Sequence, residues 1–354
     1  MLIAKQQDVY FGTGNKHGDG IYYSQLNEKT GTLSSPVKMA NIKGPGFLAK
    51  HPNLNIIYAV AEIDKQGVVV AYQRSENNTL TEINSKAIGD GRSAHIAVHP
   101  SGAFLLTAQY GGSSVALFSL NNQGAIIKRE QLIKHEGGSG VVTGRQNTPH
   151  PHWVGFSPDG RFAVVPDLGL DQAVIYQIKQ NRLEQHSLAI SVAGGGPRHM
   201  RFSTNGQYIH LLNELSLSIT TFAYDQKNGT TKAINTVQTL SEETKSQESF
   251  NSASEILVHP TGRFVYSANR GHDSVSVFSS DETTGSLKLI ETEHVRGAFP
   301  RNINLDLNGQ WLLAAGQHSN TVSVFSIDAK SGKLQFQTNS TVNVPEPICI
   351  LFVK

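Results

Sequence analysis

The segment SASEILVHPTGRFVYSANRG, residues 252–271, predicts the architecture of the chain because its pattern recurs five more times. It reads as a short apolar strand, a His-Pro turn with a glycine, a second apolar strand and a polar end. A repeat of roughly 50 residues is typical of architectures that stack one supersecondary unit many times. The other copies are GPGFLAKHPNLNIIYAVAE (44–62), SAHIAVHPSGAFLLTAQY (93–110), HPHWVGFSPDGRFAVVPDLG (150–169), GPRHMRFSTNGQYIHLLNEL (196–215) and FPRNINLDLNGQWLLAAGQH (299–318).

Each copy is followed by two more strand-like runs, so each repeat predicts a four-stranded blade. The chain ends supply a seventh blade, with PEPICILFVK (345–354) as its first strand and three runs within 8–42 as the others. We therefore expect an all-β protein, a seven-bladed β-propeller with four antiparallel strands per blade, forming a single domain over residues 1–354. The N- and C-terminal strands share one blade and close the ring, which removes exposed sheet edges. A pair of β-sandwiches or a six-bladed ring would require the terminal strands to pair elsewhere.

Composition narrows the function classes. The 354 residues carry 30 Lys and Arg against 28 Asp and Glu, a net charge of +2 that does not indicate a dedicated nucleic-acid binder. The single cysteine, Cys349, excludes an intrachain disulfide and lies in an apolar run (348–353), where we expect a buried thiol. No secretory signal is recognised in residues 1–10 and no run approaches about 18 apolar residues, so a cytoplasmic protein without membrane contact is expected. The sequence does not indicate an oligomeric state.

Polar residues gather at one end of the predicted ring. The start of each first strand and the end of each second strand share one rim, because the two strands are antiparallel. The first-strand column contains His95, His152 with Trp153, Arg198 with His199, Glu255, and Arg301 with Asn302. The second-strand column contains Asn15, Glu62, Gln109, Asp167, Glu214, Arg270 and Gln317. A constant position with different functional groups indicates a substrate pocket on the axis; the alternative is a solvated funnel whose charges pair with one another.

The strongest candidates in these columns are two arginines, a carboxylate and a histidine. Arg198 and Arg270 have no acidic neighbour in sequence, which favours anion binding over a structural ion pair. Glu214 follows an apolar run, so it is either a desolvated carboxylate with a raised pKa, suited to acid–base work, or the ion-pair partner of Arg198. The alignment of the repeats places His152 at the rim, in the first-strand column, whereas it does not place His150 there.

Weaker candidates complete the set. Arg301 and Gln317 are interpreted as binding residues, and the interpretation extends to three side chains that orient neighbours or touch substrate: His95, Asp167 and Glu255. The histidines of the His-Pro turns, His51, His99 and His259, belong to the opposite end of the ring and are expected to be structural. Two long polar loops, 135–149 and 241–251, lead into first strands on the functional rim, either as lids or simply as mobile segments.

Several of these segments carry a family resemblance. GPRHMRF, LLNEL, SASEILVHPTGRFVYSANR and FPRNINLDLNGQWLLAAGQHSNTVSVF resemble the propeller family of bacterial 6-phosphogluconolactonases and fungal carboxymuconate-lactonizing enzymes, over nearly the whole chain. The resemblance implies a seven-bladed propeller and assigns the catalytic histidine to His152, the arginines to Arg198 and Arg270, and the acidic residue to Glu214. The resemblance also includes the Pro-Arg pair that contains Arg301 and the segment AAGQ that ends at Gln317. The stretch PDLGLDQ (166–172) departs from the bacterial pattern, which is not acidic at the Asp167 position, and this leaves the exact substrate open.

The function that the resemblance implies is hydrolysis of 6-phosphoglucono-1,5-lactone to 6-phosphogluconate in the pentose phosphate pathway, without a metal or organic cofactor. The arginines would bind the phosphate and stabilise the oxyanion, while one of His152 and Glu214 activates water and the other protonates the leaving oxygen. One alternative is a cycloisomerase or lactonase that acts on a muconate-like polycarboxylate. Another is a non-catalytic propeller that binds protein partners.

Overall fold

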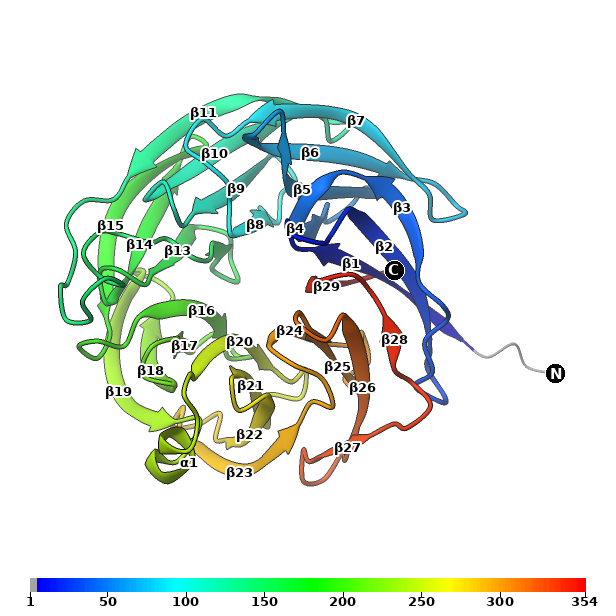
Figure 1. Ribbon diagram of the computed structural model, residues 1–354. Coiled ribbons are helices and arrows are strands. Elements are labelled where there is room, and N and C mark those ends of the chain that lie inside the picture. Colours follow the sequence, from blue (N-terminus) through cyan, green and yellow to red (C-terminus); the bar gives the residue numbers. More distant parts are fainter. Residues whose placement is uncertain (1–4) are drawn as a thin grey trace.

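The computed structural model describes residues 5–354 as a ring of seven sheets around a central axis (Figure 1). The predicted seven-bladed β-propeller is therefore confirmed. Each blade has its first strand nearest the axis, and the strands are antiparallel neighbours in order outward. The blades are β29 (Pro347–Val353), β1 (Gln6–Thr13), β2 (Gly20–Asn27), β3 (Val37–Asn41); β4 (Lys43–Lys50), β5 (Ile56–Ile63), β6 (Gln66–Arg74), β7 (Leu80–Ala87); β8 (His95–Val98), β9 (Phe104–Gln109), β10 (Ser114–Leu120), β11 (Ile126–Lys134); β12 (Gly155–Phe156), β13 (Phe162–Asp167), β14 (Gln172–Lys179), β15 (Arg182–Ile190); β16 (Pro197–Phe202), β17 (Tyr208–Asn213), β18 (Ser218–Asp225), β19 (Thr230–Gln238); β20 (Ser252–Val258), β21 (Phe264–Arg270), β22 (Ser274–Ser280), β23 (Leu287–His294); and β24 (Pro300–Leu305), β25 (Trp311–Gly316), β26 (Thr321–Ile327), β27 (Leu334–Phe336), with β28 (Val342–Asn343) also paired to β26.

The ring closes as the sequence predicts, because the C-terminal strand β29 is the inner strand of the blade that β1, β2 and β3 complete. β29 and β1 are antiparallel, with Val9 opposite Phe352 and Phe11 opposite Ile350. These four side chains are buried between the first and last blades, together with Leu313 and other apolar residues of β25 and β26. Closure thus joins the two ends of the chain through both backbone hydrogen bonds and apolar packing.

The hydrophobic core lies between neighbouring blades, and second strands such as β21 are buried along their full length. Such strands read as nearly continuous apolar runs because both of their faces pack against another sheet. Cys349 belongs to this core, as predicted, and burial raises the pKa of its thiol to about 12.

The histidines of the His-Pro turns connect adjacent blades at the end of the ring away from the polar rim. Nε2 of His99 lies 2.9 Å from the carbonyl oxygen of Gly160, and Nε2 of His259 lies 2.8 Å from that of Gly309. Both glycines have positive φ, 71° and 69°, which only glycine adopts readily at these tight turns. His51 makes the same contact to the next blade at 3.3 Å. These contacts agree with a structural role for the three histidines.

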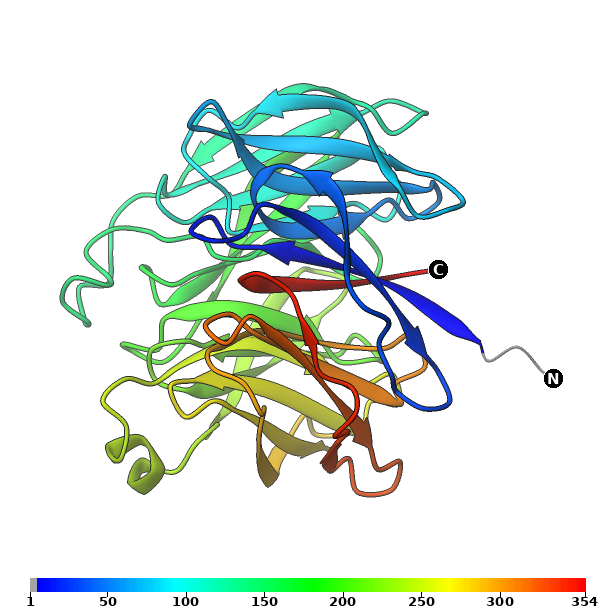
Figure 2. The same cartoon turned by 45° about the vertical axis from the view of Figure 1, so that its right-hand side comes forward.

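The long loop 241–251 contains the short helix α1 (Glu242–Ser246), which the periodicity of the sequence does not indicate. The Ser241 side chain caps its N-terminus by accepting a hydrogen bond from the backbone N–H of Thr244 at 3.1 Å. Figure 2 shows the helix and a green loop, whose colour matches residues 135–149, extending from the same side of the ring. Within residues 5–354, no helix is long and apolar enough to cross a membrane.

Candidate active site

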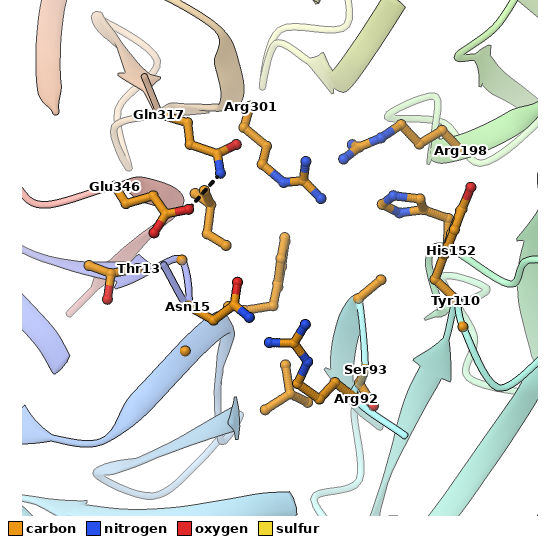
Figure 3. Close-up of a pocket in the computed structure, with 18 of the residues that line it drawn as sticks. Thr13, Asn15, Arg92, Ser93, Tyr110, His152, Arg198, Arg301, Gln317 and Glu346 are labelled. Carbon is orange, nitrogen blue, oxygen red and sulfur yellow. Dashed lines mark hydrogen bonds between the residues drawn. The ribbon is translucent and has the colours of Figure 1, made fainter. Parts of the chain in front are cut away.

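A cavity of about 640 Å³ lies on the ring axis, at the rim where first strands begin and second strands end. Its size is typical of a site for a small molecule. All seven blades contribute side chains to its wall, and Figure 3 shows several of them pointing toward its centre. The predicted candidates that line it are His152, Arg198, Glu214, Arg270, Arg301 and Gln317.

The cavity wall is strongly basic although the whole protein is nearly neutral. Six cationic side chains and two carboxylates line it, a net charge of +4 with neutral histidines. The field of such a concave wall concentrates anions. The charged lining residues are Lys16, Arg92, Arg145, Arg198, Arg270, Arg301, Glu214 and Glu346.

Glu214, directly after β17, organises three of these arginines. Its Oε2 accepts hydrogen bonds from Nε of Arg198 at 2.8 Å and pairs with Nη2 of Arg270 at 3.1 Å. Its Oε1 accepts a hydrogen bond from Nη2 of Arg145 at 2.7 Å. Both carboxylate oxygens are therefore engaged, and three cations share one anion.

These contacts decide between the two interpretations of Glu214. Burial by itself would raise the pKa of its carboxyl, but the charges of Arg270 and Arg198 and the hydrogen bond from Arg145 outweigh burial. The pKa of Glu214 consequently lies well below its usual value. The expectation of a raised pKa is wrong, and the ion-pair alternative is confirmed: Glu214 is an ionised carboxylate with no proton to donate.

Arg301 on β24 differs from the arginines around Glu214. It forms no hydrogen bond or ion pair with another described residue, and Figure 3 shows its guanidinium pointing into the cavity beside Arg198 and His152. Burial and the charge of Arg270 lower the pKa of Arg301 to about 10, so it remains a cation at neutral pH. A guanidinium with all of its donors free is suited to bind a bidentate anion.

His152 lies in the extended segment that precedes β12. Burial, with the nearby charge of Arg198, holds the pKa of its imidazole well below the ordinary value of 6.5. The ring is therefore neutral at physiological pH. Its Nδ1 is buried without a hydrogen-bond partner in the described part of the chain, whereas Nε2 is not among the fully buried atoms and faces the cavity. A neutral imidazole at the cavity surface can accept a proton.

Three predicted residues share the rim register but do not line the cavity. Asp167 is fully buried, with Oδ2 2.6 Å from Nδ1 of His135 and Oδ1 accepting the backbone N–H of His150 at 2.7 Å. His95 packs its ring against Phe47 and Trp153. The expected contact of Asp167 and His95 with substrate does not fit these positions, because both side chains contact other residues inside the wall of the cavity.

Glu255, the third of these residues, is buried and also lies behind the wall. Its Oε1 is 3.0 Å from both Nδ1 of His199 and Nη2 of Arg201, and its Oε2 accepts a hydrogen bond from Asn302 at 2.7 Å. It therefore supports other residues of the wall, which agrees with the interpretation of Glu255 as an orienting residue rather than a substrate ligand.

Some lining residues are missed by the sequence interpretation. Arg145 comes from the loop 135–149 and Phe250 from the loop 241–251, so both predicted long loops reach the site. Arg92, in the loop before β8, also points toward the centre of the cavity (Figure 3). Gln317 donates a hydrogen bond to Glu346 at 3.0 Å, and Glu346 in turn accepts backbone N–H groups of the loop 14–18. For Arg92, Arg145, Phe250 and Glu346, the sequence offers a single signal, their place in a loop on the polar rim.

The described residues contain no group of three or more His, Cys, Asp or Glu side chains arranged to hold a metal ion. The functional groups of the cavity are instead five guanidiniums, a lysine ammonium, two carboxylates and neutral imidazoles. This set can bind an anion, stabilise a negative charge that develops on oxygen, and accept a proton from water.

Comparisons with known proteins agree with this chemistry. The family described as "Lactonase, 7-bladed beta-propeller" matches residues 8–352. The chain is 32% identical to the 6-phosphogluconolactonase of Bacillus subtilis, over 97% of both proteins, and 36% identical to that of Formosa agariphila, over 86% of this chain and 87% of the relative. Among solved structures, the periplasmic gluconolactonase PpgL of Pseudomonas aeruginosa is similar, with a TM-score of 0.90 and 26% identity over 99% of both chains.

Proposed function

We propose that this chain, which belongs to the seven-bladed β-propeller lactonase family, hydrolyses 6-phosphoglucono-1,5-lactone to 6-phosphogluconate. The observation that carries the proposal is the juxtaposition, in one cavity, of a neutral histidine and a cluster of arginines with excess positive charge. The substrate is an anionic, activated ester, so it requires positioning and modest acid–base assistance. The reaction belongs to the pentose phosphate pathway, and a cytoplasmic location stays a prediction.

His152 is the general base of the proposed reaction. Its Nε2 takes a proton from a water molecule while the water oxygen bonds to the lactone carbonyl carbon, which forms a tetrahedral oxyanion. The intermediate then collapses, the bond from that carbon to the ring oxygen breaks, and the proton held by His152 passes to this oxygen. The products are a carboxylic acid, which ionises, and a free hydroxyl group.

Two arginines have different roles in the proposed reaction, one at the oxyanion and one at the phosphate. Arg198 is held rigidly by Glu214 and by its hydrogen bond to the carbonyl oxygen of Ser254, so it is a preorganised donor for the oxyanion. Arg301, with its donors free, binds the phosphate. Glu214 has a structural and electrostatic part, because it holds Arg145, Arg198 and Arg270 in place against their mutual repulsion.

Formation of 6-phosphogluconate from freshly generated lactone, followed with a coupled dehydrogenase, tests the proposal. We expect acceleration over spontaneous hydrolysis that persists in a chelator, since the described residues offer no metal-binding cluster. No acceleration would refute the assignment and direct attention to muconate-type lactones, which the same arginines could bind through carboxylates. Activity that a chelator abolishes would contradict the metal-independent mechanism.

Replacing Arg301 with alanine should reduce kcat/KM for the phosphorylated lactone by about 10- to 100-fold, mainly through KM. This factor corresponds to one lost charge-assisted interaction of roughly 1.5–3 kcal/mol. The unphosphorylated glucono-1,5-lactone should be affected little. Arg301→Lys is the matched control, because it keeps the charge but loses the bidentate geometry. Its kcat/KM for the phosphorylated lactone should lie between those of the wild type and Arg301→Ala. An equal loss on both lactones would contradict a phosphate-binding role.

As the pH is lowered from 8, kcat/KM should stay constant through pH 6.5 and begin to fall only at lower pH. This parameter reports ionisations of the free enzyme, and the active form of the base is the neutral imidazole. Activity is therefore lost as the pH falls through the pKa of His152, which lies well below 6.5. Initial rates between pH 5 and 8 would check this. A half-maximal point at or above pH 6.5 is inconsistent with His152 as the base.

A further inference from the structure

Two buried ring nitrogens beside the cavity lack partners within the part of the chain that the structure describes. They are Nδ1 of His152 and Nε2 of His199. The two rings are neighbours, with centroids 5.2 Å apart and planes inclined at 59°. A buried polar atom without a hydrogen bond costs about 1–3 kcal/mol, so two such atoms at adjacent rings call for a common explanation.

Glu255 determines which nitrogen of His199 carries the proton. Nδ1 of His199 lies 3.0 Å from Oε1 of Glu255, and both side chains are almost completely buried, 2% and 1% exposed. A carboxylate accepts hydrogen bonds, so this Nδ1 is protonated and donates. In a neutral imidazole the other nitrogen, Nε2, is then an acceptor. His199 therefore has a lone pair, and not a proton, on this buried nitrogen, and its ring is a neighbour of His152.

His152 has the complementary requirement. A base that takes a proton on Nε2 must carry its own proton on Nδ1, and this proton needs an acceptor. The described side chains that surround the histidine pair are cationic or already engaged: Arg198, Arg201, Arg270 and Arg301 can only donate, and both oxygens of Glu214 accept from arginines. The ring of Tyr110 also lies beside His152, with centroids 5.4 Å apart, but its hydroxyl accepts a hydrogen bond from Nη2 of Arg145 at 3.5 Å. The third ring of the cluster, His95, lies beside His199, with centroids 5.5 Å apart, and its Nδ1 already faces the backbone N–H of Val154. His199 is the neighbour with a free acceptor.

We propose that His199, held by Glu255, is the positioning residue for His152: its Nε2 accepts a hydrogen bond from Nδ1–H of His152 through one bridging water, because neither nitrogen has a direct partner among the described residues. This contact orients the His152 ring and leaves its Nε2 free to take the proton of the attacking water. Glu255, His199 and His152 thus form a carboxylate–imidazole–imidazole chain that ends at the cavity. The inference rests on the proposed function for its catalytic consequence, but not for the protonation states.

Nitrogen-15 NMR of the imidazole groups in the wild-type protein tests the chain without any substrate. Nδ1 of both His152 and His199 should be protonated, with the His152 signals identified by their loss in His152→Gln. In His199→Phe, His152 should shift toward the Nε2–H form. Finding His152 with its proton on Nε2 in the wild type would overturn the proposal, even if His199→Phe does not fold.

Kinetics with matched variants supply the second test. His199→Phe should lower kcat about 10- to 100-fold with little change in KM, as is typical when a partner that orients a functional histidine is removed. His199→Gln keeps an acceptor and a donor and should recover most of the rate. His95→Phe is the control, because it makes the same replacement in the same aromatic cluster outside the chain, and it should change kcat less than a few-fold. Equal losses in His199→Phe and His95→Phe would overturn the positioning role. If the wild type fails to hydrolyse the phosphorylated lactone while NMR shows the predicted protonation states, the proposed function fails and the hydrogen-bonded chain stands.

Discussion

His152→Gln should lower kcat for the phosphorylated lactone by about 10²- to 10⁴-fold, the usual contribution of a general base. Glutamine is similar in size but does not accept a proton near neutral pH, so water would have to attack without assistance. The stability of the protein should hardly change, because the glutamine amide fits the same space and can donate a hydrogen bond in place of Nδ1–H. The measurement is the coupled assay at saturating lactone, with spontaneous hydrolysis subtracted.

His150→Gln provides the control for this result. His150 is two residues away and half-buried, and its Nδ1 interacts with the carbonyl oxygen of Tyr110 at 2.8 Å, but it does not line the cavity. Its replacement should leave kcat within a few-fold of the wild type. Comparable losses in the two variants, or a His152→Gln enzyme with nearly full activity, would remove His152 from the role of base.

Glu214→Gln should lower the free energy of unfolding by about 3–5 kcal/mol, the cost of removing one partner from a buried ion pair. The neutral amide leaves Arg145, Arg198 and Arg270 close together with no anion between them. The largest part of this cost is the repulsion of buried like charges, so added phosphate or sulfate should restore part of the stability. Denaturant titration with and without these anions measures both effects. Activity should fall as well, because Arg198 loses the contact that orients it.

The matched control is Glu62→Gln at the same rim. Glu62 pairs with Lys43 at 2.5 Å and with Arg92 at 3.6 Å, and both cations are about half exposed. Ion pairs of this kind contribute less than about 1 kcal/mol, so the control should unfold near the wild type. A Glu214→Gln protein as stable as the Glu62→Gln protein would show that Glu214 does not hold the arginine cluster together.

Much of the candidate site follows from strand register. The two rim columns bring His152, Arg198, Glu214, Arg270 and Arg301 to one cavity, because every blade places its first-strand start and second-strand end at the same end of the ring. Register also explains why some rim residues do not line the cavity, since it specifies the rim but not the direction of a side chain. Asp167 and Glu255 occupy rim positions, yet their hydrogen bonds turn them into the wall.

Lining residues that lie in loops, outside the repeated strands, could not be predicted from strand register. Arg145 lies in an irregular loop, where no period relates sequence position to direction in space. It reaches Glu214 across 69 residues of sequence, and this single contact engages the second oxygen of that carboxylate.

The repeated pattern in the sequence was sufficient to predict the seven-bladed ring and the end of the ring at which the polar cavity lies. Six copies of one apolar pattern, together with the terminal strands, can bury their sheet faces only by stacking around an axis, and this solution does not depend on any one contact. The ionisation states of the site were decided by the tertiary structure alone. The pKa of Glu214 is raised by burial and lowered by arginines from three other places in the chain, and His152 is neutral because the same fold buries it beside cations. Such opposing contributions depend on distances of a few ångströms, which only the folded ring defines.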